Sequence, residues 1–166
     1  MRIRQECSDD IPAIGLLIQR AFASAAHSNG CEQFIVAALR RAGVLTVSLV
    51  ADNAGRLQGQ VAFSPVSLSD GSPNWYGLGP ISVEPSAQGT GIGTALIHTG
   101  LDRLRGRGAA GCVVLGEPGY YERFGFRQIA ELRYPGPPPE YFLALPFGSV
   151  VPQGEVSYHA SFAAEA

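Results

Sequence analysis

Charged residues are scarce in this sequence, and neither sign dominates. Aspartate, glutamate, lysine and arginine make up 16% of the 166 residues, which gives a net charge of −2 and a pI near 5.9. Proteins that bind nucleic acid usually carry a strongly positive surface that attracts the phosphate backbone. We therefore expect no nucleic-acid partner.

Cysteine is also rare. The chain contains Cys7, Cys31 and Cys112, an odd number without CxxC spacing. This pattern favours reduced thiols over a disulfide framework or a zinc site, so we expect no metal. Cys112 would be the candidate for an acyl-cysteine intermediate, but it lies in an apolar run, where burial would raise its pKa and make it unreactive.

Long apolar runs are absent as well. No run approaches the roughly 18 residues that cross a membrane, and the N-terminus from Met1 to Glu6 does not resemble a secretory signal. We therefore expect a cytoplasmic protein without a membrane partner. A hydrophobic content of 46% is enough for one substantial core and predicts a single domain over residues 1–166.

The most informative stretch, residues 78–96, has the pattern of a strand, a turn, a glycine-rich loop and a helix. Ile81 and Val83 have strand spacing between Pro80 and Pro85, two residues that cannot donate a backbone hydrogen bond. The strand should therefore end just before the second proline.

The glycine-rich loop places Gly89, Gly91 and Gly93 immediately before a helical pattern that starts at Thr94. Glycine allows the main chain to approach a ligand closely, and the free N–H groups and dipole of a helix N-terminus attract a pyrophosphate. The spacing differs from a Walker loop, which needs a lysine, and from the G-x-G-x-x-G dinucleotide fingerprint. The alternative is a glycine-rich turn that binds no ligand.

Hydrophobic periodicity and turn residues predict the other elements. The predicted helices are one that ends near Ala26, one over 31–41 and one over 92–105, with a helical turn at 120–124. The predicted strands are one that begins at Ile3 and others at 44–51, 57–66, 75–84 and 112–115. Extended segments are predicted from Phe126, at 141–145 and at 155–162. The three long strands should be antiparallel neighbours, and the following helix should cross right-handed to a parallel strand. The last two runs are predicted to form a closing hairpin.

Two motifs resemble those of a known superfamily. Gln88, Gly91 and Gly93 match the (Gln/Arg)-x-x-Gly-x-(Gly/Ala) coenzyme A signature of the GCN5-related N-acetyltransferase (GNAT) superfamily, and the segment 121–126, YERFGF, resembles its Tyr-x-x-x-Gly-Phe element. The late segment 154–159, GEVSYH, is similar to the YhbS-like branch of predicted N-acetyltransferases.

The resemblance implies an α/β fold with a mixed, mostly antiparallel twisted sheet of about seven strands, split between the fourth and fifth strands, and helices on both faces. It implies an acetyl-CoA-dependent N-acetyltransferase that transfers the acetyl group directly to a primary amine of a small molecule, an amino acid or a peptide. Acetyl-CoA would be the co-substrate. Members of the superfamily often form homodimers through their C-terminal strands, but the sequence does not identify the oligomeric state of this chain. The alternatives are an acyl-CoA-binding regulatory module without turnover and an N-acyltransferase that uses another short acyl-CoA.

The resemblance also assigns roles to residues. Tyr121 would be the general acid, because a phenol is protonated at neutral pH and can donate to the departing thiolate. Alternatively, Tyr121 only packs beside Phe124, and the adjacent Tyr120, which points about 100° away on a helix, stays open as a second candidate. The Val83 N–H would polarise the thioester carbonyl. The residues expected to bind the coenzyme, mainly through their backbone, are Ile81, Ser82, Val83, Gln88, Gly89, Thr90, Gly91, Ile92, Gly93 and Thr94.

Other roles stay open at this stage. The candidates for a general base are Glu84, Glu117, His27 and His159, and in this superfamily an ordered water can take the proton instead. Arg103, Arg105 and Arg107 are candidates for the adenosine 3′-phosphate, with a solvated helix end as the alternative. Many members carry a coenzyme-binding asparagine after the fifth strand, where this chain has residues 116–118, GEP. The acceptor is not identified by the sequence.

Overall fold

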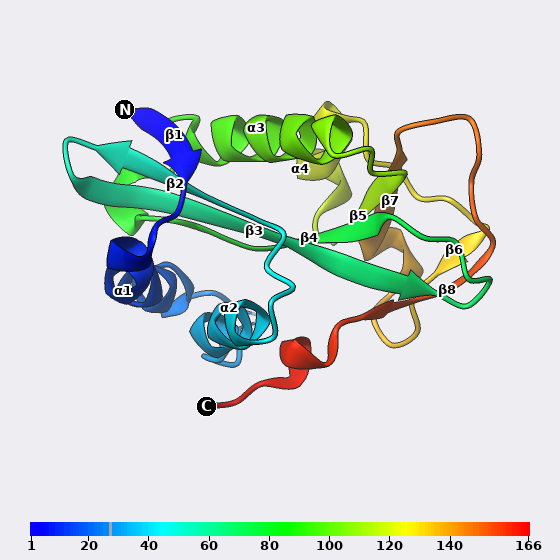
Figure 1. Cartoon of the computed structure of the whole chain (residues 1–166), viewed down its shortest axis with the longest axis horizontal. Coiled ribbons are helices and arrows are strands. Elements are labelled where there is room, and N and C mark those ends of the chain that lie inside the picture. The colour runs from blue at the N-terminus through cyan, green and yellow to red at the C-terminus, as the bar shows by residue number, and fades with distance from the viewer. Residues whose placement is uncertain (27) are drawn as a thin grey trace.

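A computed structural model describes residues 1–26 and 28–166. Over these residues the chain forms an eight-stranded sheet with α1 and α2 on one face and α3 on the other (Figure 1). The helices are α1 (Ile11–Phe22), α2 (Glu32–Arg41), α3 (Ile92–Gly106) and α4 (Pro118–Tyr121). The strands are β1 (Arg2–Gln5), β2 (Val47–Asn53), β3 (Arg56–Leu68), β4 (Trp75–Val83), β5 (Gly111–Leu115), β6 (Leu132–Arg133), β7 (Phe142–Pro146) and β8 (Gly154–Tyr158).

The strand order β1-β2-β3-β4-β5-β7 confirms the predicted mixed sheet. β2, β3 and β4 are antiparallel neighbours, and α3 connects β4 to a parallel β5. β5 pairs with β4 only from Trp75 to Leu78, whereas β4 continues to Val83. The two strands therefore separate after Leu78, as the superfamily resemblance predicted, and we call this gap the strand split.

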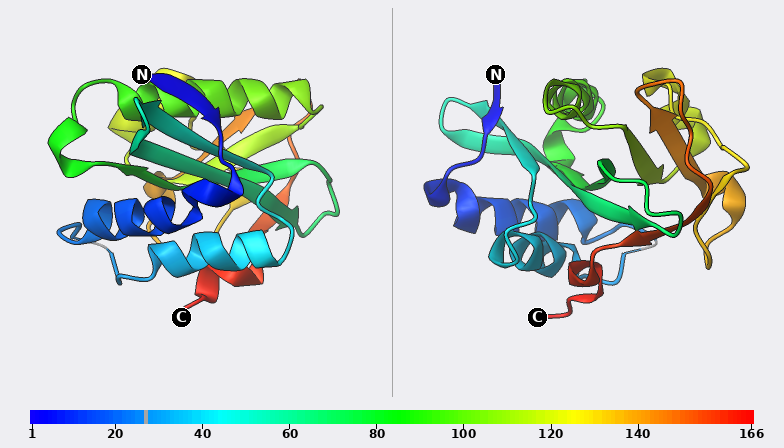
Figure 2. Two further views of the ribbon diagram at one scale, coloured as in Figure 1. Left: turned by 60° about the vertical axis from the view of Figure 1, so that its left-hand side comes forward. Right: turned by 45° about the vertical axis from the view of Figure 1, so that its right-hand side comes forward.

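The two faces of the sheet carry different cores because side chains alternate along each strand. Val61 and Phe63 of β3 pack in the cluster that includes α3, whereas Ala62 packs in the cluster formed with α1 and α2. Figure 2 shows the two helical layers on opposite sides of the sheet. Even-numbered residues near the middle of β3 therefore face α1 and α2.

The predicted closing hairpin is wrong. β7 pairs with β5, while β8 crosses the molecule to pair antiparallel with the end of β3, from Val66 to Leu68, and parallel with β6. The alternating pattern of β8 correctly indicated a strand, but alternation specifies which side chains are buried and not which strand lies alongside.

Two smaller expectations also differ from the structure. α1 ends at Phe22 rather than near Ala26, because the buried stripe of Ile14, Leu17 and Ile18 stops there and the next four residues are exposed. The sheet has eight strands rather than about seven, because the two-residue β6 joins through β8. Over the described residues, no helix combines the length and the apolar character that a membrane span requires.

Candidate active site

The glycine-rich loop forms an open cradle, residues 88–94, at the N-terminus of α3. Gly91 precedes the first residue of α3 with φ of +91°, a conformation that glycine adopts without the steric cost of a Cβ. A Cβ built on Gly91 would meet no atom within 4 Å, so the backbone there faces open space. The cradle borders a cavity of about 280 Å³ that is lined by Val83, Ala87, Gln88, Gly89, Gly91, Ile92, Gly93, Thr94, Tyr120 and Arg123.

Two side chains fasten the cradle to the chain that precedes it, one at the end of β4 and one at the turn after it. The Gln88 amide donates to the Val83 carbonyl at 3.3 Å, and the Thr90 hydroxyl donates to the Ala87 carbonyl. The first N–H groups of an α-helix have no partner within the helix, so those of α3 are free to bind an anion. The cradle therefore fits a diphosphate held by main-chain groups.

The open edge of β4 supplies further donors. The Glu84 N–H donates to the Gln58 carbonyl of β3 at 2.8 Å. N–H groups in an antiparallel pair alternate in direction, so those of Ile81 and Val83 point away from β3 and into the strand split. The Ile81 and Val83 side chains face α3, within 4 Å of where a Cβ on Gly93 would lie.

Ser82 lies differently from the other residues expected to bind the coenzyme. It is paired with Gln60, so its main-chain groups are directed at β3, and its side chain faces away from α3. The side chain is 2% exposed, and its hydroxyl has no partner among the described residues. The structure does not bring Ser82 to the cradle.

Tyr120 and Arg123 form a side-chain wall that the sequence reasoning missed. The Tyr120 hydroxyl oxygen lies 3.2 Å from where a Cβ on Gly93 would be. The Arg123 guanidinium lies 4.5 Å from the Tyr120 ring centroid, and its Nε donates to the Tyr120 carbonyl at 2.9 Å. The spacing of three residues, which places both on one side of a helical turn, was the available signal. Arg123 thus brings a positive charge to the cradle.

Tyr121 points to the inner side of the same turn. Its ring packs against Gly116, just beyond β5, and lies 6.0 Å from the Phe126 ring centroid and 6.3 Å from that of Phe124. Burial raises the pKa of Tyr121 to about 12, with smaller contributions from Tyr120 and Cys112. The phenol is therefore protonated at neutral pH, and it also makes the packing contact that was the alternative expectation.

Glu84 is engaged in a structural ion pair. Arg20 of α1 donates from Nε to both carboxylate oxygens at 3.1 Å and from Nη2 to one of them at 2.8 Å. These hydrogen bonds lower the pKa of Glu84, although burial opposes the shift. A carboxylate held this way is a weak general base, and its position ties α1 to the end of β4.

The remaining candidates lie apart from the cradle or have other partners. His159 accepts a hydrogen bond from the Ser161 N–H at 3.1 Å, and Glu117 is exposed and is not among the residues that line the cradle cavity. His27 lies outside the described residues. The structure therefore indicates no general base within its described part.

The arginines at the end of α3 are distant from the cradle, which lies at the start of this 15-residue helix. Arg105 stacks over the Phe147 ring at 4.5 Å. Cys112 is fully buried, and burial raises the pKa of its thiol well above the usual range, which leaves it unreactive. Within the described residues, no group of three or more His, Cys, Asp or Glu could hold a metal ion.

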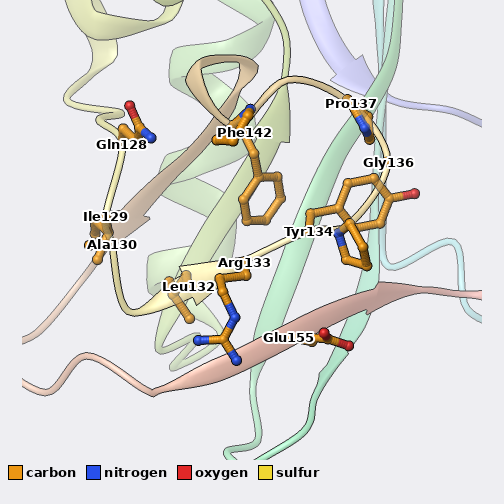
Figure 3. Close-up of a pocket in the computed structure, with 12 residues that line it drawn as sticks. Gln128, Ile129, Ala130, Leu132, Arg133, Tyr134, Gly136, Pro137, Phe142 and Glu155 are labelled. Atoms are coloured by element: carbon orange, nitrogen blue, oxygen red, sulfur yellow. The ribbon is translucent and has the colours of Figure 1, made fainter.

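A second cavity, of about 490 Å³, is larger than the one at the cradle and lies elsewhere, on the face of the sheet opposite α3 (Figure 3). Tyr134 and Phe142 stand beside it with ring centroids 5.5 Å apart, and Arg133 and Glu155 come from the paired strands β6 and β8. The cradle, rather than the larger cavity, carries the free main-chain donors.

Comparison with known proteins identifies the family. Residues 32–128, more than half of the chain, match the profile described as an acetyltransferase (GNAT) domain. The chain is 40% identical over 141 residues to the uncharacterized N-acetyltransferase YhbS of Escherichia coli K12, which covers 82% of this chain and 81% of YhbS.

Solved structures agree with this match. A GNAT family acetyltransferase from Brucella melitensis, in complex with acetyl-CoA, superposes with a TM-score of 0.87 at 48% identity over 97% of both chains. Escherichia coli YhbS in complex with CoA superposes with a TM-score of 0.89 at 36% identity, covering 98% of this chain and 91% of that one. With the strand split and the cradle in place, these similarities show that the chain belongs to the GNAT acetyltransferase family.

Proposed function

We propose that this protein is an acetyl-CoA-dependent N-acetyltransferase that transfers the acetyl group directly to a primary amine of a small molecule, an amino acid or a peptide. The observation that carries the proposal is the open cradle at the N-terminus of α3, beside the unpaired edge of β4. The two similar structures with acetyl-CoA or CoA support it, since both share this fold over nearly the whole chain.

The residues around the strand split have complementary roles in this proposal. The amides of the cradle, with Arg123, hold the diphosphate of the coenzyme. When bound, acetyl-CoA supplies the acetyl thioester. The Val83 N–H, directed into the split, donates to the carbonyl oxygen as negative charge develops on it.

Tyr121 donates its proton to the departing sulfur in this scheme. Burial keeps the phenol protonated at neutral pH, so it can hydrogen-bond to the sulfur and donate its proton as negative charge develops there. The enzyme's main contribution is then to hold the amine and the thioester in the reacting geometry.

The test is a free-thiol assay with acetyl-CoA and a panel of primary amines: benzylamine, ethanolamine, spermidine, alaninamide and a short peptide. We expect amine-dependent release of CoA, with the N-acetylated product confirmed by mass spectrometry. Succinyl-CoA and propionyl-CoA in parallel assays define the acyl preference. Because Cys7 is exposed, the thiol signal of the enzyme alone must be subtracted. Coenzyme binding without thiol release for any amine would contradict the proposal.

A further inference from the structure

Among the described residues, three buried hydroxyl groups without partners lie on the face of the sheet opposite α3, those of Ser64, Ser82 and Tyr158. Ser64 is fully buried, and its hydroxyl has no hydrogen-bond partner among the described residues. The same is true of the Tyr158 hydroxyl, which is also buried. Buried polar groups are nearly always paired in proteins, so two such exceptions close together indicate a partner that is bound only at some stage of function.

Ser64 and Tyr158 lie close together in the sheet, at the base of the strand split. Ser64 is opposite Gly77 in the β3–β4 pair, and Tyr158 is opposite Val66, two residues further along β3. The Tyr158 ring lies over Gly77, because a Cβ built there would be 2.6 Å from the tyrosine Cε1. Leu78, next to Gly77, makes the last contact between β4 and β5 before they separate.

Tyr158 and Tyr121 approach the split from opposite faces of the sheet. Tyr121 packs in the cluster around α3, whereas Tyr158 packs in the cluster on the other face. Burial raises the pKa of the Tyr158 phenol far above its usual value, and Cys112, Tyr134 and Tyr121 raise it further. The phenol therefore keeps its proton and can offer both an O–H and an oxygen lone pair.

We propose that Tyr158, together with Ser64, binds the nitrogen of the acceptor amine at the base of the strand split, on the face opposite the coenzyme. This inference rests on the proposed N-acetyltransferase function and names the acceptor-side residues. The amine needs its lone pair to attack the thioester, so only its N–H groups are available for binding. The Tyr158 and Ser64 oxygens, which have no partner among the described residues, each accept one of these N–H groups.

The test compares Tyr158→Phe and Ser64→Ala with the wild-type enzyme, using the amine of the panel that the wild type acetylates best. Tyr158→Phe keeps the ring over Gly77, so folding should be preserved, which thermal denaturation checks. We expect the KM for the amine to rise about 3- to 10-fold, the effect of one lost hydrogen bond. The dissociation constant for CoA, measured by calorimetry, should change less than twofold in both variants.

Two matched variants serve as controls. Tyr134→Phe removes a phenol whose ring centroid is 5.2 Å from that of Tyr158, and Ser67→Ala removes an exposed hydroxyl from the same strand as Ser64. Both should leave the KM for the amine unchanged.

The outcomes separate this inference from the proposed function. Turnover in the wild type with unchanged amine KM in both Tyr158→Phe and Ser64→Ala would overturn the inference alone. A crystal structure with CoA and the amine that showed only an ordered water between the two hydroxyl groups would do the same. No turnover of any amine by the wild type would remove the proposed function and this inference with it.

Discussion

Neighbouring residues of this chain have different roles because one residue of a helix advances the side-chain direction by about 100°. Tyr120 lines the cradle together with Arg123, whereas Tyr121 packs inward against Gly116. The motif spacing identified Tyr121 from the sequence, but the direction of each ring depends on contacts with Gly93 and Gly116 that no local pattern specifies. The two phenols should therefore respond differently to the same substitution.

Replacing Tyr121 by phenylalanine should lower kcat by at least about 100-fold, the usual loss when a general acid is removed. The affinity for CoA should stay nearly intact, because the ring and its packing remain. Burial disfavours the phenolate and raises the Tyr121 pKa to about 12, so kcat of the wild type should not fall between pH 7 and 10 through loss of this proton. Steady-state kinetics over this pH range and CoA calorimetry provide the measurements.

Tyr120→Phe is the matched comparison. It should leave kcat within about threefold, because Tyr120 lines the cradle in which the diphosphate is proposed to bind. If Tyr120→Phe lost turnover and Tyr121→Phe did not, the two roles would have to be exchanged.

At the scale of the elements, the strand, cradle and helix between Trp75 and Gly106 were predictable because their signals are local. Pro85 follows the end of the strand, although Pro80 lies within it, a glycine supplies the left-handed turn at Gly91, and apolar periodicity continues into α3. The contact of the Tyr120–Arg123 wall with the cradle and the Arg20–Glu84 pair were not predictable, since each depends on where separate elements meet.

Gly91→Asp should abolish detectable binding of CoA. The substitution places a side chain and a negative charge in the cradle, where the diphosphate is expected, and forces a non-glycine residue into φ of +91°. Gly108→Asp is the matched control, because Gly108 also has positive φ, at +79°, and open space around its Cβ but lies just beyond the opposite end of α3. Calorimetric titration with CoA measures both. Wild-type affinity in Gly91→Asp would exclude the cradle as the coenzyme site.

The contact between α1 and the end of β4 should depend on pH through Glu84. Its pKa is lowered by the hydrogen bonds from Arg20, so the contribution to stability is present above the unfolded-state pKa and is lost as pH falls through the folded-state pKa. Glu84→Gln should lower the free energy of unfolding by about 1–2 kcal/mol at pH 7, a modest value because Arg20 is half exposed.

Urea denaturation at several pH values measures this effect. The difference between wild type and Glu84→Gln should shrink below about pH 5, as the carboxylate becomes protonated. Arg20→Gln and the double variant complete a thermodynamic cycle, and additive effects of the two substitutions would show that the pair contributes no coupling energy.

At the scale of the whole molecule, β8 links parts of the chain that are far apart in sequence. It pairs with β3 at Val66–Leu68 and with β6 at Leu132–Arg133, and thereby brings Tyr158 to the strand split. The split itself was anticipated from the superfamily resemblance, whereas the crossover helix predicted only that β5 is parallel to β4. The pairing of β8 with β3 was not anticipated, because the spacing of apolar residues within a strand does not specify which strand, here about 90 residues away, lies alongside it.

Val156 should therefore be important for stability despite its position near the C-terminus. It is 1% exposed, is paired with Leu68, and packs in the cluster that contains Leu132 and Phe142. Val156→Ala should lower the free energy of unfolding by about 2 kcal/mol and Tm by about 4–8 °C. Val150→Ala, at a position that is 80% exposed, is the control and should change Tm very little. Equal, small shifts of Tm in both variants would mean that β8 is not an integral part of the sheet, and Tyr158 would then have no fixed place beside the acceptor.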